Sequence, residues 1–265
     1  MINSIIFSKD RAMQLDLLLQ SIYKNAPETF NINVLYKFSD EEFERGYNIL
    51  KEKYQNVNFI SENDFKSQTL NLLNQNYEYS CFFTDDDIIY NSFNETDIIK
   101  TMGENPEIFC FSLRLGKNVK VCYSMKSENV LIPESENDNI IIWNWTKHYM
   151  DFGYPLSVDG HIFKTKDILK LSTNIAYKNP NTFEAALQIF DTFPKQKMAA
   201  YKTSVLVNTP VNIVQSVFEN RKAELFSYSV KDLNQLFLTG KRISLEEMDF
   251  TNIVGCHQEL ELKIN

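Results

Sequence analysis

Three consecutive aspartates, Asp85, Asp86 and Asp87, are the residues of this sequence best suited to chemistry. They follow the apolar run Tyr79-Ser-Cys-Phe-Phe-Thr84, which does not alternate with polar residues and is therefore typical of a strand buried on both faces. Ligands of open α/β sheets bind outside the carboxyl ends of the strands, so we expect these carboxylates to face a crevice. A divalent cation shared with substrate phosphates would relieve their mutual repulsion. A polar turn without a ligand is the alternative interpretation.

Strands and helices alternate in the stretch that must position the aspartates. Residues 2–7 are an expected strand, and apolar residues then recur at helical spacing until Ala26-Pro27 ends the helix. A second strand over 32–38 leads to Ser39-x-x-Glu42, whose spacing is typical of a capping box at a helix start. This alternation predicts a parallel sheet with right-handed connections. The other elements expected here are a strand over 57–60, a helix over 64–76 and a central strand from Tyr79.

After the aspartates the pattern changes to strand-like runs with few helices between them. The predicted fold class is α/β, with a wound, mostly parallel, Rossmann-like central sheet in the N-terminal half and a mixed α+β C-terminal half. No internal repeat, low-complexity tract or Pro/Gly-rich linker divides the chain, which favours one continuous domain. The expected strands cover residues 108–115, 119–125, 130–132, 140–143, 156–164, 203–207 and 261–264, and the expected helices cover 182–193 and 230–238.

Composition restricts the class of protein and its partners. The chain has 265 residues, of which 43% are apolar, and this is ample for a packed core. A formal net charge of −8 opposes binding to nucleic acid or to an anionic membrane. No signal peptide or transmembrane segment is expected. The cysteines are far apart in apolar stretches, so we expect reduced core residues and a cytoplasmic protein; they are Cys81, Cys110, Cys122 and Cys256.

The order of these features resembles the nucleotide-sugar-dependent glycosyltransferases of the A-type (GT-A) fold, and in particular family-2-like bacterial enzymes. A wound half, Phe83-Thr-Asp-Asp-Asp87 after a buried strand and a mixed second half carry the resemblance, which covers roughly residues 2–215. It implies metal-dependent transfer of a hexosyl or related sugar from a nucleoside-diphosphate sugar to an acceptor hydroxyl of a saccharide or glycoconjugate. It also implies that residues 1–100 bind the donor and that residues 101–265 bind the acceptor.

The resemblance further implies which residues bind the metal and the nucleotide. Asp85 and Asp87 would ligate Mn²⁺ or Mg²⁺, and His257 in the C-terminal segment would complete the metal site. The turn after the first strand and the end of the second would hold the nucleoside. Arg11 can pair with a diphosphate and Asp40 can accept from a base N–H, although Arg11 could equally be a solvated residue at a helix start. The implied nucleotide-binding residues are Ser8, Asp10, Arg11, Ser39, Asp40, Lys66 and Asp86.

Transfer with inversion requires a carboxylate base on the acceptor side. Glu184, expected in the first turn of a helix, is favoured as the base, and Asp159 is favoured for acceptor binding because Gly160 allows close approach of a sugar. A helix cap and a turn anchor are the respective structural alternatives, and retention of configuration stays open. Four aromatic residues would either stack on sugar faces or belong to the core: Trp143, Trp145, Tyr149 and Tyr154.

Other classes of protein use similar motifs. A haloacid-dehalogenase-type phosphatase would carry its aspartates on the first strand, and an EF-hand loop would need Gly where Tyr90 stands. A nucleotidyltransferase shares the wound half, but it would favour a Gly-rich phosphate loop after the first strand, and the first glycine of this chain is Gly46. A nucleotidyltransferase and a non-catalytic nucleotide-binding protein remain the alternatives.

Overall fold

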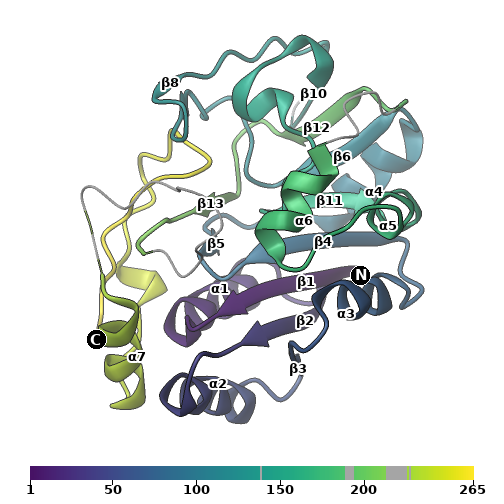
Figure 1. Ribbon diagram of the computed structural model, residues 1–265. Helices are drawn as coiled ribbons and strands as arrows, with labels where there is room; N and C mark the ends of the chain where they lie inside the picture. The colour runs from purple at the N-terminus through teal and green to yellow at the C-terminus, as the bar shows by residue number, and fades with distance from the viewer. Residues whose placement is uncertain (138, 189–193, 213–225, 227) are drawn as a thin grey trace.

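The computed structural model describes residues 1–137, 139–188, 194–212, 226 and 228–265 (Figure 1). Its largest element is one nine-stranded sheet. The strand order is β3-β2-β1-β4-β11-β6-β12-β10-β9, so the chain winds outward from β1 to β3 and then returns to the other side of β1 for β4. The direction of winding therefore reverses between β1 and β4, and such a switch point opens a crevice at the carboxyl ends of the two strands.

The N-terminal half is wound and parallel, as the sequence predicted. All neighbouring strands in β3-β2-β1-β4 are parallel. The strands are β1 (Ile2–Lys9), β2 (Phe30–Lys37), β3 (Asn58–Ser61) and β4 (Tyr79–Thr84), and the connecting helices are α1 (Ala12–Asn25), α2 (Glu41–Lys53) and α3 (Phe65–Leu73).

The second half continues the same sheet with mixed strand directions, which confirms the predicted change of pattern. Strand β11 (His161–Lys164) lies between β4 and β6 and is antiparallel to both. The sheet then continues through β6 (Ile108–Ser112), β12 (Lys197–Tyr201), β10 (Ile140–Asn144) and β9 (Ser135–Glu136). Two small sheets pair β5 (Asp87–Ile89) with β13 (Leu206–Asn208) and β7 (Val121–Cys122) with β8 (Ser127–Glu128). The remaining helices are α4 (Glu95–Glu104), α5 (Thr165–Thr173), α6 (Pro180–Leu187), α7 (Val230–Leu238) and the short 3₁₀ helices η1 (Trp145–Lys147), η2 (Met150–Gly153) and η4 (Leu245–Glu247).

Both faces of the sheet are covered, and this explains the unbroken apolar runs in its strands. Phe7 and Phe82 point to the face packed by α3, α5 and α6, whereas Ile6 and Phe83 point to the opposite face, packed by α1, α2, α4 and α7. Each of these four side chains is at most 3% exposed. Helix α7 also packs against α1 and α2, which brings the C-terminal part of the chain beside the N-terminal half (Figure 1).

Several predicted elements are shorter than expected or absent. Strand pairing within 119–125 is limited to β7, and residues 130–132 form no strand; Met125, Val130 and Ile132 are 64%, 64% and 68% exposed, so their apolar character does not reflect a buried strand. The strand predicted over 156–164 begins only at His161. The strand predicted over 203–207 is β13, and the one over 261–264 is reduced to a bridge between Ile243 and Ile264.

Helix α6 begins earlier than predicted. Asn179 caps it by accepting a hydrogen bond from Thr182 N, and Pro180 occupies the first turn, where its missing N–H costs nothing. Glu184 therefore lies beyond the first turn, and its side chain is not the helix cap. The last part of the predicted helix, residues 189–193, lies outside the described residues.

Candidate active site

A cleft of about 1160 Å³ opens at the carboxyl ends of β1, β2 and β4. It extends from the ends of these strands to the loops that follow β7 and β10 and to the start of α6. Seven of the predicted site residues line it: Ser8, Arg11, Asp85, Asp86, Asp159, Glu184 and His257. The other five do not line it: Asp10, Ser39, Asp40, Lys66 and Asp87.

At one end of the cleft, two carboxylates converge on a single guanidinium nitrogen. Arg11 Nη1 donates to Asp85 Oδ1 and to Asp86 Oδ2, both at 3.0 Å. The backbone N–H of Lys9 also donates to Asp85 Oδ2, at 3.1 Å. Burial raises the pKa of the Asp85 carboxyl to about 6, because the attraction of Arg11 only partly offsets the loss of solvation. The turn after β1 and the end of β4 thus form one charged unit.

Asp87 is turned away from this unit into the protein. Its side chain accepts hydrogen bonds from Thr84 N at 2.9 Å and from Asn208 Nδ2 at 3.1 Å, and the residue is fully buried. Burial and the negative charges of Asp159 and Asp86 raise its pKa well above the usual range. Its role as a metal ligand stays a prediction, and the structure gives it a second role in the β5–β13 pairing, where it lies opposite Asn208.

Asn208 connects the aspartates, and sequence reasoning missed it. Its Nδ2 lies 2.9 Å from Asp86 Oδ1 and 3.2 Å from Thr84 Oγ1, in addition to its bond to Asp87. No motif marks this asparagine, because its position follows from the pairing of β13 with β5 rather than from its neighbours in the chain.

Asp159 is the centre of a second group of polar side chains that line the cleft. It accepts hydrogen bonds from Thr84 Oγ1 at 3.0 Å and Arg114 Nη1 at 3.4 Å, and its Oδ2 lies 3.3 Å from His257 Nε2. Burial alone would raise its pKa, but His257 and Arg114 outweigh that effect and hold the pKa below its usual range. The lowered pKa favours the ionised form of Asp159 and makes it a poor proton acceptor.

Glu184 has the opposite electrostatic environment. Its carboxylate accepts from Val158 N at 3.3 Å, and it lines the cleft. Burial and the charge of Asp159 raise its pKa to about 7, and Arg114 offsets only part of that rise. Two carboxylates with pKa values pushed apart are the usual arrangement of acid–base sites. The structure thus brings together the two acids that the sequence singled out and distinguishes between them.

Arg114 is a second residue that sequence reasoning missed. Its side chain is 2% exposed, it lines the cleft, and its Nε has no hydrogen-bond partner among the described residues. A signal for it existed, because a charged residue interrupts the apolar stretch Phe111–Leu115. Charged side chains are rarely buried without a partner, so such an interruption is typical of a functional or ion-paired residue.

The remaining predicted nucleotide-binding residues make structural contacts outside the cleft. Asp10 accepts from Ser39 N and Ser39 Oγ at 2.7 and 2.6 Å, which ties the turn after β1 to the end of β2. Asp40 caps α2 by accepting from Glu42 N and Phe43 N. Lys66 Nζ donates to the carbonyl oxygens of two residues at the end of α5 and just beyond it, Thr173 and Ile175, at 3.2 and 2.7 Å.

The aromatic residues divide between the core and the cleft. Trp143 and Trp145 are 0% and 7% exposed and belong to the core, where their indole N–H groups donate to backbone carbonyls. Tyr149 is 85% exposed, and it lines the cleft together with Tyr154. Of the four predicted aromatic residues, these two are the ones that line the cleft and could present a ring to a ligand there.

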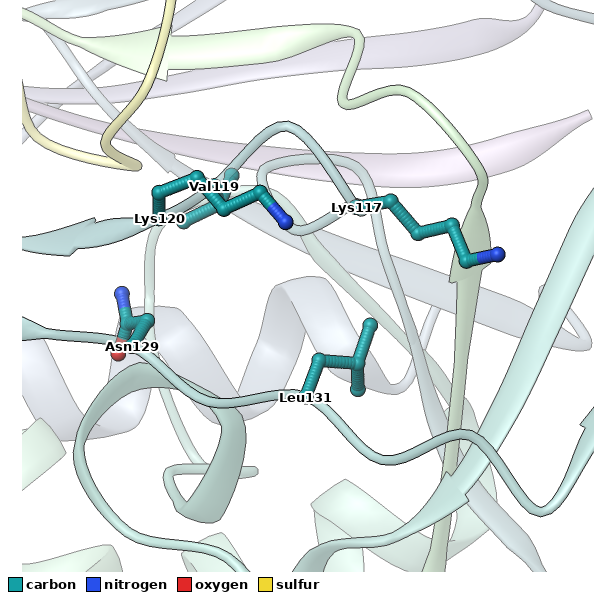
Figure 2. Close-up of a pocket in the computed structure, with 5 residues that line it drawn as sticks. All are labelled: Lys117, Val119, Lys120, Asn129 and Leu131. Carbon is teal, nitrogen blue, oxygen red and sulfur yellow. The ribbon is translucent and has the colours of Figure 1, made fainter.

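A second, smaller cavity of about 320 Å³ contains none of the predicted site residues (Figure 2). Lys117 and Lys120 lie in the loop between β6 and β7, at the top of the view, and Asn129 and Leu131 lie below them. The Asn129 amide donates to Asp151 Oδ2 at 2.7 Å, and Asp151 lines the main cleft. One hydrogen bond therefore joins a residue that lines this cavity, Asn129, to a residue that lines the cleft, Asp151.

Comparisons with known proteins agree with the resemblance noted from the sequence. The chain is 28% identical, over 281 aligned positions, to the bifunctional glycosyltransferase pgtA of Dictyostelium discoideum. The chain is similar to a known glycosyltransferase. The alignment covers 93% of this chain and 36% of the relative, so the chain spans about a third of that protein's length. No protein-family model matches the chain.

Solved glycosyltransferase structures are also similar to it. TarS of S. aureus (residues 1–349), solved in complex with UDP-GlcNAc, is 16% identical, with a TM-score of 0.46 over 77% of this chain and 56% of that one. The mannosyltransferase PcManGT from Pyrobaculum calidifontis, solved with GDP-Man and Mn²⁺, is 12% identical, with a TM-score of 0.45 over 74% of this chain and 53% of that one. Among the described helices, none has the length and apolar character needed to cross a membrane.

Proposed function

We propose that the chain is a glycosyltransferase that moves a sugar from a nucleoside-diphosphate sugar to an acceptor hydroxyl. The proposal rests on one cleft that is lined both by the charged group Arg11, Asp85 and Asp86 and by the carboxylate of Glu184. A cation beside two acids suits a diphosphate bound through a metal, and a carboxylate with a raised pKa suits removal of a proton. The similarity to pgtA over 93% of the chain supports this reading.

Residues 1–100 would supply the charged side chains of the donor half of the cleft, where Asn208 supports them, and residues 101–265 would supply the acceptor half. In the donor half, Ser8 and Arg11 follow β1, and Asp85 and Asp86 follow β4, so the diphosphate would lie across the switch point between the two strands. The nucleoside end of this site would be shaped by residues that do not line the cleft themselves. Asp10 and Ser39 are hydrogen-bonded to each other, and Asp40 caps α2. In the acceptor half, Tyr149 and Tyr154 would contact a saccharide or glycoconjugate.

The carboxylates at the donor end fit a hard divalent cation such as Mn²⁺ or Mg²⁺. Asp85 and Asp86 already hold one cationic nitrogen between them, that of Arg11, at 3.0 Å from each. Their oxygen donors are those preferred by such ions, and both residues line the cleft. Asp85 and Asp86 would therefore hold the ion, and Asp87 would fix their position through Thr84 and Asn208. When bound, the ion neutralises charge that develops on the departing diphosphate.

The acceptor end supplies the base. The acceptor oxygen forms a bond to the anomeric carbon while the bond from that carbon to the diphosphate oxygen breaks, and the hydroxyl proton passes to the Glu184 carboxylate. Asp159 stays ionised beside Arg114 and His257, and it would accept a hydrogen bond from another acceptor hydroxyl. Attack from the side of Glu184, opposite the leaving diphosphate, inverts the anomeric configuration.

A thermal-shift screen of nucleoside diphosphates, with and without Mn²⁺, tests the donor half of this proposal. A ligand that binds only the folded chain raises the melting temperature. We expect one nucleoside diphosphate to raise it, and to do so more strongly with Mn²⁺ than without. A shift that is equal with and without Mn²⁺ would remove the metal from the proposal, and no shift with any nucleotide would contradict the donor site itself.

A further inference from the structure

Three side chains at the cleft wall converge in a way that suits a thiophilic metal ion, and one of them is His257, which the resemblance assigned to the donor metal site. One ligand atom from each of Asp151, Cys256 and His257 lies within 4.8 Å of the others, and among the described residues this is the one group of three or more such side chains. Asp151 and His257 line the cleft, and Cys256 is fully buried behind them. We propose that this cluster binds Zn²⁺ or a similar ion, such as Co²⁺, independently of the hard cation at Asp85 and Asp86.

The spacing of the atoms fits a tetrahedral ion. Zn²⁺ binds thiolate sulfur at about 2.3 Å and imidazole nitrogen at about 2.0 to 2.1 Å, which places two tetrahedral ligands about 3.5 Å apart. Cys256 Sγ and His257 Nδ1 are 3.4 Å apart. A donor set of one sulfur, one nitrogen and one carboxylate oxygen binds Zn²⁺ and Co²⁺ in preference to Mg²⁺ and Mn²⁺.

Two of the three ligands, His257 and Asp151, are also oriented by a hydrogen bond on the side away from the cluster. His257 faces Cys256 with Nδ1, while its Nε2 lies 3.3 Å from Asp159 Oδ2. A metal-bound histidine commonly donates its second ring N–H to a carboxylate in this way, which fixes the ring and its tautomer. Asp151 Oδ2 accepts from the buried Asn129 amide at 2.7 Å, which leaves Oδ1 available. These contacts hold His257 and Asp151 in place without using the atoms that would bind the ion.

The charges balance when a divalent ion binds. The carboxylate of Asp151 and the thiolate of Cys256 together neutralise a charge of +2, and the neighbouring Arg114 is neutralised by Asp159 at 3.4 Å. Binding releases to solvent the thiol proton of Cys256 and the Nδ1 proton of the imidazolium form of His257, because thiolate and neutral imidazole are the binding forms. Three protein ligands leave the fourth position open toward the cleft, where water or a substrate oxygen would complete the coordination.

Titration of the purified full chain with Co²⁺ tests the site, because a cobalt–thiolate bond absorbs in the near ultraviolet and tetrahedral Co²⁺ absorbs in the visible range. We expect one equivalent of Co²⁺ to produce both bands, Zn²⁺ to remove them by displacement, and excess Mn²⁺ to leave them unchanged. Absence of a near-ultraviolet band at one equivalent would overturn the proposal.

Variants assign the ligands. Cys256→Ser should remove the near-ultraviolet band, and Asp151→Asn should keep it while weakening Co²⁺ binding at least about 10-fold. The matched control is Cys122→Ser, which replaces a cysteine that lines the cleft but does not belong to the cluster, and it should change neither band. A band that survives in Cys256→Ser, or disappears in Cys122→Ser, would contradict the assignment. Melting of each metal-free variant establishes that it is folded, and Cys256→Ala replaces Cys256→Ser if the serine variant is not.

Discussion

Arg11 Nη1 donates to Asp85 Oδ1 at 3.0 Å, and both side chains are less than a tenth exposed. This pair joins the turn after β1 to the end of β4 across the switch point of the sheet. The guanidinium also neutralises Asp86, so one cation holds two carboxylates at the edge of the cleft. Removal of that cation would leave two poorly solvated negative charges side by side.

Arg11→Met should therefore destabilise the fold strongly. Removing one partner of a buried ion pair costs about 3 to 5 kcal/mol, because the other charge is left uncompensated. The loss should be smaller at pH 5 than at pH 8: burial already raises the pKa of Asp85 to about 6, and without Arg11 that carboxyl becomes neutral more readily at low pH. Denaturant unfolding at the two pH values measures this. Lys24→Met removes the exposed pair with Glu246 and serves as a control, with an expected loss of at most about 1 kcal/mol.

Asp86→Asn should weaken nucleoside-diphosphate binding in the presence of Mn²⁺ more than Asp87→Asn does. Asp86 lines the cleft, whereas Asp87 is fully buried and bonded to Thr84 and Asn208. Burial favours the neutral form of Asp87, so an amide at that position should be tolerated by the fold. Calorimetric titration of both variants measures their nucleotide affinities. A greater loss of affinity in Asp87→Asn would instead identify Asp87 as a metal ligand.

Asn208→Ala tests the positioning of the aspartates. The asparagine amide lies within hydrogen-bond distance of Asp86, Asp87 and Thr84. Its loss leaves buried acceptors without a donor, which costs about 1 to 3 kcal/mol of stability. We expect a weaker Mn²⁺-dependent nucleotide affinity in addition to the lower melting temperature. Unchanged nucleotide affinity in a folded variant would limit Asn208 to a structural role in the β5–β13 pair.

Glu184→Gln should raise the stability of the chain at pH 8 but not at pH 5. Burial and Asp159 raise the folded-state pKa of Glu184 to about 7, above the unfolded value of about 4.3. The folded state therefore binds the proton more tightly, and this stabilising contribution is present below the unfolded pKa and is lost as the pH rises through about 7. Glutamine keeps the group neutral at every pH. Melting curves at pH 5 and pH 8 check the prediction. Equal changes in melting temperature at both pH values would show that folding does not raise the pKa of Glu184.

The sequence predicted the core of the fold well because burial on both faces leaves a clear signal. Unbroken apolar runs, such as Tyr79–Thr84, are typical of strands covered on both sides, and the structure confirms this strand. Predictions over 119–132 were wrong in part because apolar residues there, including Met125 and Ile132, are exposed. Periodicity cannot distinguish an exposed apolar residue from a buried one.

The candidate site could be predicted only where its residues follow strands of the wound half or carry charge in an unusual context. Asp85, Asp86 and Arg11 lie at strand ends, and the sheet geometry brings such residues together. The inward orientation of Asp87 could not be predicted, because it depends on Asn208, 121 positions away in the chain. For the same reason, nothing in the sequence indicated that Cys256 and His257 would meet Asp151.

An assay of product formation tests directly whether the chain transfers a sugar to an acceptor. The chain would be incubated with Mn²⁺, the nucleoside-diphosphate sugar selected by the binding screen and a panel of saccharide acceptors, and the products would be analysed by mass spectrometry and NMR. We predict release of the nucleoside diphosphate and a glycosylated acceptor with inverted anomeric configuration. Glu184→Gln should lower this rate about 10²- to 10⁴-fold while leaving nucleotide affinity nearly unchanged. Nucleotide binding without any transfer, release of pyrophosphate instead of a nucleoside diphosphate, or full activity of Glu184→Gln would contradict the account.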